Sequence, residues 1–402
     1  MSDSALSRIT LDGSTAESDI AAYIDGIRDR PQHRDHLVAL LPQGHALYAG
    51  RGANQVVRIR GYVLASFELT GLPELALVYV LEELENSQKP YLVAAAAKAL
   101  RGMSAPSSEL VPFLLAAITN IQYRDDALSF ESYTTTWPLQ NHTTALIEIL
   151  HTFEHLGIHA RSALPALEAM QTSPVFNTDI RRRTGEAIRV IRSDTRQVPQ
   201  DCCSVPTGKC RAPVDRVNCR DAAQVSDIRL EDQDGRTLTF AEAFCGKPTV
   251  AAFFYTRCEN PNKCSLTVTK LGQLQNEFMA RKLNRRVRIA AMTYDPGHDT
   301  AERLRGYCEN RGFRFDADNC AWRADKSRFD AVRSFFDLGA NYSGSVVSRH
   351  RIELFILNED GKVVTSYANL QWDVQDVADD VNALLAEEPR PIGSHTTSQS
   401  GP

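Results

Sequence analysis

The sequence predicts two domains of different fold class, an all-α helical-repeat domain followed by an α/β domain. The chain has 402 residues, too many for one ordinary hydrophobic core. Apolar residues recur at helical spacing across residues 54–192, whereas apolar runs of strand length alternate with helical segments across residues 222–386. All nine cysteines lie after residue 201, so any sulfur chemistry belongs to the second half.

Three further segments complete the predicted domain organisation. Residues 1–53 are expected to form a helical lead-in, residues 193–221 a cysteine-rich linker, and residues 387–402 a disordered tail. The helical pattern stops between Ser193 and Pro199, and we therefore place the domain boundary there.

The helical half is predicted to be a stack of paired helices. The expected helices cover residues 54–69, 73–84, 91–100, 109–118, 143–156, 160–170 and 179–191. Pairs repeating every roughly 30–50 residues are typical of an α-solenoid, in which neighbouring pairs bury each other's apolar faces. The Val111-Pro112 and Leu164-Pro165 steps resemble HEAT-type repeats, which implies a surface that recruits a client protein. The insert over residues 122–140 is long enough to be functional or disordered.

Charge and hydropathy exclude several classes of function. The net charge of −5 gives no global basic field, so no nucleic-acid partner is expected. The N-terminus lacks a basic stretch followed by an apolar run, and no segment approaches the ~20 consecutive apolar residues of a membrane helix. We therefore expect a cytoplasmic protein without stable membrane insertion, whose thiols are mostly reduced.

Short apolar runs and helical segments alternate in the second half. The expected strands cover residues 249–255, 287–293, 352–357 and 362–367. The expected helices cover residues 266–282, 300–310, 326–336 and 374–385. Asp360-Gly361 between the last two strands is a hairpin signal. This order predicts a central sheet covered by helices on both faces.

Two cysteines follow the first predicted strand of the α/β half. Cys258 and Cys264 lie just past its end, and the carboxyl ends of parallel strands are where α/β sheets carry reactive groups. Asn260 and Pro261 favour the start of a helix, which would place Cys264 in a first turn. The helix dipole favours a thiolate at that position.

Basic residues flank both cysteines. Arg257 directly precedes Cys258, and Lys263 directly precedes Cys264. Neighbouring positive charge lowers the pKa of a thiol, so we expect both sulfurs to be pushed toward the thiolate. Such a pair suits either a soft-metal site or a thiol-redox site.

Three runs of the second half resemble the copper-binding SCO/SenC family. They are the loop from Thr256 to Cys264, the Asp-Pro-x-x-Asp-Thr run within residues 292–300, and the run over residues 348–355. The order of strand, cysteine loop, helix and later hairpin is thioredoxin-like. The resemblance covers about residues 222–386 and implies a thioredoxin-like α/β domain.

The resemblance also implies the ligands of a copper site. By position, Cys258, Cys264 and His350 take the ligand roles, and Asp295 takes a place near the site. Two thiolates and one imidazole form a soft set of donors that suits Cu(I) better than Mg²⁺ or Ca²⁺. Copper, as Cu(I), is therefore the expected cofactor.

The chain departs from the family pattern at two points. Five residues separate Cys258 from Cys264, where the family usually has three. Positions i and i+6 of a continuous helix point to different faces, so residues 259–262 are expected to form an irregular loop. Arg349 stands where the family commonly has an acidic residue.

A second cluster of cysteines precedes the α/β half. It consists of Cys202, Cys203, Cys210 and Cys219. Their spacing matches no paired Cys-x-x-Cys zinc motif, which leaves a second metal or relay site, redox-active thiols, or no shared role.

Three functions compete for these residues. The leading hypothesis is a copper-binding SCO-like protein that binds or transfers copper, with the helical repeats recruiting a client. The second is a thiol–disulfide oxidoreductase or redox sensor that uses Cys258 and Cys264. The third is a non-catalytic scaffold, for which substitution of Cys258 would have no consequence.

Overall fold

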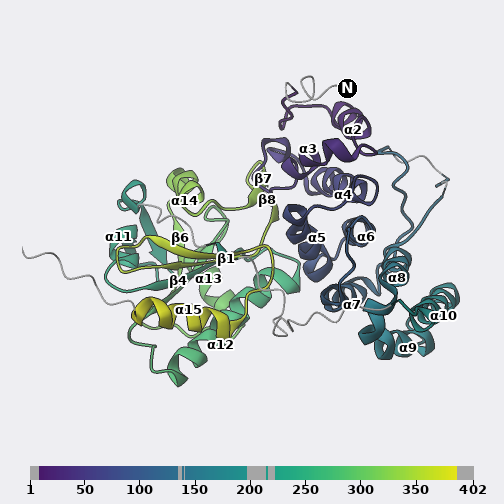
Figure 1. Ribbon diagram of the computed structural model, residues 1–402. Helices are drawn as coiled ribbons and strands as arrows, with labels where there is room; N and C mark the ends of the chain where they lie inside the picture. The colour runs from purple at the N-terminus through teal and green to yellow at the C-terminus, as the bar shows by residue number, and fades with distance from the viewer. Residues whose placement is uncertain (1–8, 135–137, 140, 197–213, 216–221, 387–402) are drawn as a thin grey trace, which may run out of the picture.

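The computed structural model describes residues 9–134, 138–139, 141–196, 214–215 and 222–386 (Figure 1). The predicted second cluster, Cys202, Cys203, Cys210 and Cys219, lies outside the described residues, as does the predicted tail over residues 387–402. The described chain has a helical N-terminal half and an α/β C-terminal half, so the predicted fold class is confirmed.

The N-terminal half is a helical domain whose helices form two layers. Its α-helices are α2 (Glu17–Asp25), α3 (Arg34–Ala39), α4 (Ala53–Thr70), α5 (Glu74–Asn86), α6 (Pro90–Leu100), α7 (Val111–Ile121), α8 (Ala145–Leu156), α9 (Leu164–Thr172) and α10 (Thr178–Ser193). α4 packs on α6, α6 on α8 and α8 on α10, while α5 packs on α7. Thr144 and Asn177 cap α8 and α10, since each side-chain oxygen accepts a backbone N–H of the first turn. The HEAT-like character of these pairs stays a prediction.

The described part of the insert over residues 122–140 packs on the helices. Phe130 is buried, with its ring centroid 4.8 Å from that of Tyr91 on α6. Tyr133 is also buried, with its ring centroid 5.6 Å from that of Tyr62 on α4. These aromatic contacts make the described insert a part of the hydrophobic core.

The C-terminal half is built on a mixed sheet of eight strands. They are β1 (Val214–Asp215), β2 (Arg229–Asp232), β3 (Thr237–Thr239), β4 (Thr249–Phe254), β5 (Arg288–Thr293), β6 (Asn319–Ala324), β9 (Glu353–Leu357) and β10 (Val363–Ala368). The spatial order is β1-β10-β9-β4-β5-β6-β2-β3. β4, β5 and β6 are parallel, and β9 runs antiparallel to both β4 and β10, so the centre of the sheet has the thioredoxin-like arrangement.

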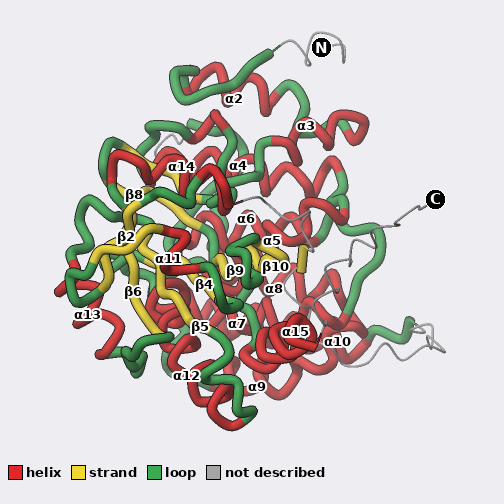
Figure 2. The backbone as a smooth tube through the Cα atoms, turned by 90° about the vertical axis from the view of Figure 1, so that its left-hand side faces the viewer, coloured by secondary structure: helices red, strands yellow, loops and turns green. Residues whose placement is uncertain are grey.

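Helices cover both faces of this sheet, as the sequence predicts. They are α11 (Phe240–Phe244), α12 (Leu266–Ala280), α13 (Ala301–Glu309), α14 (Phe329–Phe336) and α15 (Val374–Ala386). Alternate residues of β4 point to opposite faces: Val250 and Phe254 join the apolar cluster of α12, α13 and α15, whereas Phe253 joins that of α14. Figure 2 shows the molecule from the left-hand side of Figure 1, with the strands of the sheet toward the viewer.

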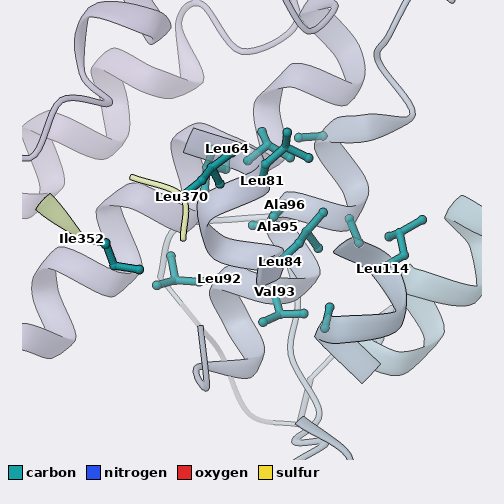
Figure 3. Close-up of a cluster of buried hydrophobic side chains, with 14 of the residues drawn as sticks. Leu64, Leu81, Leu84, Leu92, Val93, Ala95, Ala96, Leu114, Ile352 and Leu370 are labelled. Carbon is teal, nitrogen blue, oxygen red and sulfur yellow. The ribbon is translucent and has the colours of Figure 1, made fainter. Parts of the chain in front are cut away.

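The two domains share one hydrophobic core. Leu81 and Leu84 of α5 belong to the same buried cluster as Ile352 and Leu370 of the α/β half (Figure 3). A separate hairpin of β7 (Ala340–Ser343) and β8 (Val346–His350) lies between the domains, with β8 against α4 (Figure 1). Of the helices that the structure describes, none combines the length and apolar character needed to cross a membrane.

Candidate metal centre

Three side chains from distant parts of the chain meet where the domains join. Nε2 of His350 lies 3.5 Å from Sγ of Cys258 and 3.4 Å from Sγ of Cys264. The three donor atoms all lie within 4.8 Å of one another. Cys264 and His350 are buried, and Cys258 is half-buried. Among the described residues, no other cluster of Cys, His, Asp or Glu is comparably close.

An irregular turn brings the two sulfurs together. The chain leaves β4 and turns at Cys258, whose backbone N–H donates to the carbonyl oxygen of Tyr255 at 3.3 Å. The Asn260 side chain then caps a short wide turn that begins at Pro261. Within that turn Lys263 has φ −111° and ψ −105°, a non-helical conformation. Of the irregular segment expected over residues 259–262, residues 259–260 are non-helical, residues 261–262 belong to the wide turn, and the break lies one residue further on at Lys263. A regular helix would turn Cys264 away.

The ring of His350 is held with one nitrogen facing the sulfurs. Nδ1 lies 2.9 Å from the carbonyl oxygen of Arg351, and because a carbonyl can only accept, Nδ1 carries the proton of that hydrogen bond. Nε2 is therefore the atom that can bind a metal. The rings of Tyr255 and Tyr294 pack on the imidazole at centroid distances of 5.3 and 5.2 Å.

The two cysteines differ in protonation. The Cys264 thiol donates a hydrogen bond to the Cys258 sulfur, and this bond and that of His350 outweigh burial and lower the pKa of Cys258 well below its usual value. Burial, followed by the adjacent Cys258 sulfur, raises the pKa of Cys264. Lys263 does push the pKa of Cys264 downward, as predicted, but burial and the Cys258 sulfur outweigh it, so the expected thiolate is favoured at Cys258 and not at Cys264.

Both flanking cations also have carboxylate partners. Nζ of Lys263 lies 3.1 Å from a carboxylate oxygen of Glu82 and donates to the carbonyl oxygen of His350 at 2.8 Å. Arg257 pairs with Asp295. The charge of each cation is therefore directed largely at a carboxylate, a partner that the sequence alone does not reveal.

Comparison with known proteins matches this region to a family. Residues 219–386 match the family model described as SCO1/SenC. The C-terminal domain is an SCO1/SenC domain. No curated protein matches the chain by sequence.

Several solved structures are similar to the SCO1/SenC domain. BsSco, a member of the Sco family of cytochrome c oxidase assembly proteins with a disulfide switch, is 22% identical over 41% of this chain and 94% of its own, at a TM-score of 0.35. Copper-bound ScoI of Bradyrhizobium japonicum is 20% identical over 39% of this chain and 96% of its own, at a TM-score of 0.33. Copper-bound yeast Sco1 is 18% identical over 40% of this chain and 92% of its own, at a TM-score of 0.32.

Two acidic residues of the SCO1/SenC domain, Asp295 and Asp299, make polar contacts with the cysteine loop. Asp295, predicted near the site, is buried and reaches the loop through Arg257, next to Cys258. Asp299 is fully buried, and its carboxylate accepts hydrogen bonds from the backbone and hydroxyl of Thr256 and from the hydroxyl of Thr293. Asp299 belongs to the Asp-Pro-x-x-Asp-Thr run, whose pattern alone does not indicate a role for it. The structure shows that it ties the end of β4 to the end of β5.

Both domains line a cavity that opens on Cys258. Its volume is about 440 Å³, and its lining includes Val56 and Lys89 of the helical domain together with Glu259 and Val347 of the SCO1/SenC domain. A metal ion or a small thiol can therefore reach the half-buried sulfur from this side, whereas Cys264 lies behind it.

Arg349 points toward the helical domain. Its guanidinium contacts Glu82 at 3.4 Å and also pairs with Glu83. An acidic residue at position 349 would face these two buried carboxylates and repel them. The arginine thus fits its actual neighbours, which belong to a domain outside the residues matched by the family model.

Proposed function

We propose that the chain binds one copper ion, as Cu(I), through Cys258, Cys264 and His350. The observation that carries this proposal is the convergence of both sulfurs on Nε2 of His350, at 3.5 and 3.4 Å, with Nδ1 occupied by the Arg351 carbonyl. Two sulfurs and one imidazole nitrogen form a soft set of few donors, which Cu(I) prefers. The copper-bound structures similar to the SCO1/SenC domain agree with this choice of metal.

The residues around the donors prepare the site for a soft cation. The lowered pKa of Cys258 favours its thiolate, and the raised pKa of Cys264 means that binding would displace the proton of that thiol. The rings of buried Tyr294 and half-buried Tyr255 pack on the imidazole and hold it in place. When bound, copper would replace the Cys264 proton as the positive group between the two sulfurs.

We propose further that the copper passes to or from a client protein. The half-buried Cys258 faces a cavity, which offers a client thiolate a route for ligand exchange. The proposal that the helical domain recruits this client rests on its repeat-like architecture alone. The cytoplasmic location stays a prediction from the sequence.

Anaerobic reconstitution of the full chain tests copper binding. We expect about one equivalent of Cu(I), retained against a chelator that competes for Cu(I). His350→Ala should bind far more weakly, whereas His298→Ala, which removes a half-buried histidine away from the donors, should bind as the unmodified chain does. Equal affinity in His350→Ala and the unmodified chain would reject the assignment.

A second function, thiol–disulfide exchange, is favoured by a thiolate and a thiol within 4.8 Å of each other. The Cys258 thiolate would attack a disulfide substrate, forming a mixed disulfide and releasing one thiolate. Cys264 would then lose its proton and attack Cys258, closing the Cys258–Cys264 disulfide and releasing the second thiolate, so two electrons pass to the substrate.

Mass spectrometry after addition of oxidised glutathione measures this reaction. The exchange function predicts a Cys258–Cys264 disulfide with a matching release of reduced glutathione. A Cys264→Ser chain should stop at the mixed disulfide on Cys258. Fully reduced peptides from the metal-free chain would exclude this function.

A further inference from the structure

Glu82 of α5 reaches from the helical domain to both segments that carry the candidate ligands. Its carboxylate lies 3.1 Å from Nζ of Lys263, the residue directly before Cys264. The same ammonium group donates to the main-chain carbonyl oxygen of His350 at 2.8 Å. One lysine therefore joins Glu82 to the cysteine turn and to the end of β8.

Arg349 gives Glu82 a second connection to the histidine. Its guanidinium lies 3.4 Å from Glu82 and also pairs with Glu83, and it belongs to the residue directly before His350. Arg60 of α4 lies 2.7 Å from Glu83 and 3.5 Å from Glu82, which closes a network of three cations and two carboxylates. The ion pairs of Glu82 and Glu83 with Lys263 and Arg349 all pass between the domains.

The network is deeply buried. The exposed fraction of the side chain is 0% for Glu82, 9% for Lys263 and 11% for Arg349. Burial alone would raise the pKa of Glu82, but Lys263, Arg349 and Arg60 outweigh it and lower that pKa to about 2, so the carboxylate is ionised at neutral pH.

Such a network does more to fix one arrangement than to increase stability. Desolvating charges is costly, and apolar residues of similar size often give equal or greater stability in their place. In some proteins, buried charged groups with fixed partners instead specify one register between the elements that carry them. Here those elements are α5, the cysteine turn and β8.

We propose that Glu82 is a positioning residue of the metal site, acting through Lys263 and Arg349. It holds the turn of Cys264 and the end of β8 at the separation at which Nε2 of His350 faces both sulfurs. The inference rests on the proposed copper site and extends it, because it makes the helical domain a structural part of that site.

Copper affinity of Glu82→Gln in the full chain tests the proposal. The substitution keeps the size of the side chain and removes its charge, and we expect Cu(I) affinity to fall about 10- to 100-fold, as for partners that orient metal ligands. Glu82→Asp, which restores the charge, should recover part of the loss. Glu74→Gln, on an exposed position of the same helix, should stay within about twofold.

A double-substitution cycle separates positioning from a general loss of stability. If Glu82 acts through Arg349, the losses in affinity of Glu82→Gln and Arg349→Gln are smaller together than the product of the two separate losses. The absorption spectrum of the copper complex should change in both single variants. The melting temperature of each metal-free variant, measured alongside, reports stability separately.

The possible outcomes distinguish this inference from the proposed function. An unmodified chain that binds no Cu(I), or binds it without His350, rejects the copper site itself. Binding that depends on His350 but is within about twofold of normal in folded Glu82→Gln overturns the role of Glu82 alone. If Glu82→Gln does not fold, Arg349→Gln decides: a folded variant with unchanged affinity and spectrum overturns the inference.

Discussion

The two ends of the central sheet each place a cysteine beside a cavity, but in opposite electrostatic surroundings. At the carboxyl ends of β4 and β5, Cys258 lies beside the thiol of Cys264 and the imidazole of His350. At the amino ends of the same strands, Cys320 lines a larger cavity of about 670 Å³. Its lining contains both arginines and carboxylates, and among the carboxylates Asp232 and Asp316 act on Cys320.

This difference shows that the groups around a cysteine set the pKa of its thiol, and with it the reactivity of its sulfur. Hydrogen bonds lower the pKa of Cys258, whereas burial, with Asp232 and Asp316, raises the pKa of Cys320 to about 12. The larger cavity therefore holds a thiol that is both protonated and without converging donors among the described residues. The smaller cavity opens on the candidate metal centre.

The largest expected effect comes from exchanging sulfur for oxygen at each end. Cys264→Ser removes a soft donor, and we expect Cu(I) affinity to fall by more than about 100-fold, beyond the loss caused by an outer partner. Cys320→Ser should leave affinity unchanged, since its sulfur is at the other end of the sheet. Chelator competition measures the Cu(I) affinity of each variant relative to the unmodified chain. Equal losses of affinity in the two variants would contradict the proposed difference between the two ends of the sheet.

The pH dependence of alkylation sharpens the comparison. The thiolate is the nucleophile, so its fraction sets how the rate changes with pH. The range from pH 6 to 9 lies above the lowered pKa of Cys258, so its thiolate fraction hardly changes there. The rate at which Cys258 reacts with iodoacetamide should therefore be nearly independent of pH. Cys320, with a pKa of about 12, should react about tenfold faster for each added pH unit. Peptide mapping of the metal-free chain gives both profiles, and parallel slopes would show that the two thiols share one environment.

A smaller effect is expected from the acidic residues that hold each end. Asp299→Asn weakens hydrogen bonds to Thr256 and Thr293 in a fully buried position, and we expect the free energy of unfolding to fall by about 1–3 kcal/mol. Asp318→Asn, at the other end, removes an ion pair with a partly exposed Lys247 and should cost no more than about 1 kcal/mol. Denaturant unfolding measures the free energy of unfolding of both variants. A larger decrease in Asp318→Asn than in Asp299→Asn would contradict this expectation.

The sequence was sufficient to predict the elements whose burial is visible as an apolar run. β4, β5 and β9 have buried residues in succession, and such runs are typical of central strands. β6 was missed because Asn319 and Arg323 interrupt its run, and the β7–β8 hairpin was missed because its polar residues pair outside the main sheet. Each strand that was not predicted pairs with another strand of the fold, and the local sequence pattern does not indicate that pairing.

The same distinction applies to the candidate site. The order of three sequence runs predicted that Cys258, Cys264 and His350 would come together, and the structure brings them together. The raised pKa of Cys264 could not be predicted, because it comes from burial and from the adjacent Cys258 sulfur, which only the folded structure shows. The ligand roles themselves, and that of Asp295, stay predictions until metal is measured.

X-ray absorption at the copper edge of the Cu(I)-loaded full chain tests the central claim most directly. We expect scattering from two sulfur atoms and one imidazole nitrogen, with the imidazole signal absent in His350→Ala. A first coordination sphere made of sulfur alone, or of oxygen donors, in the unmodified chain would contradict it.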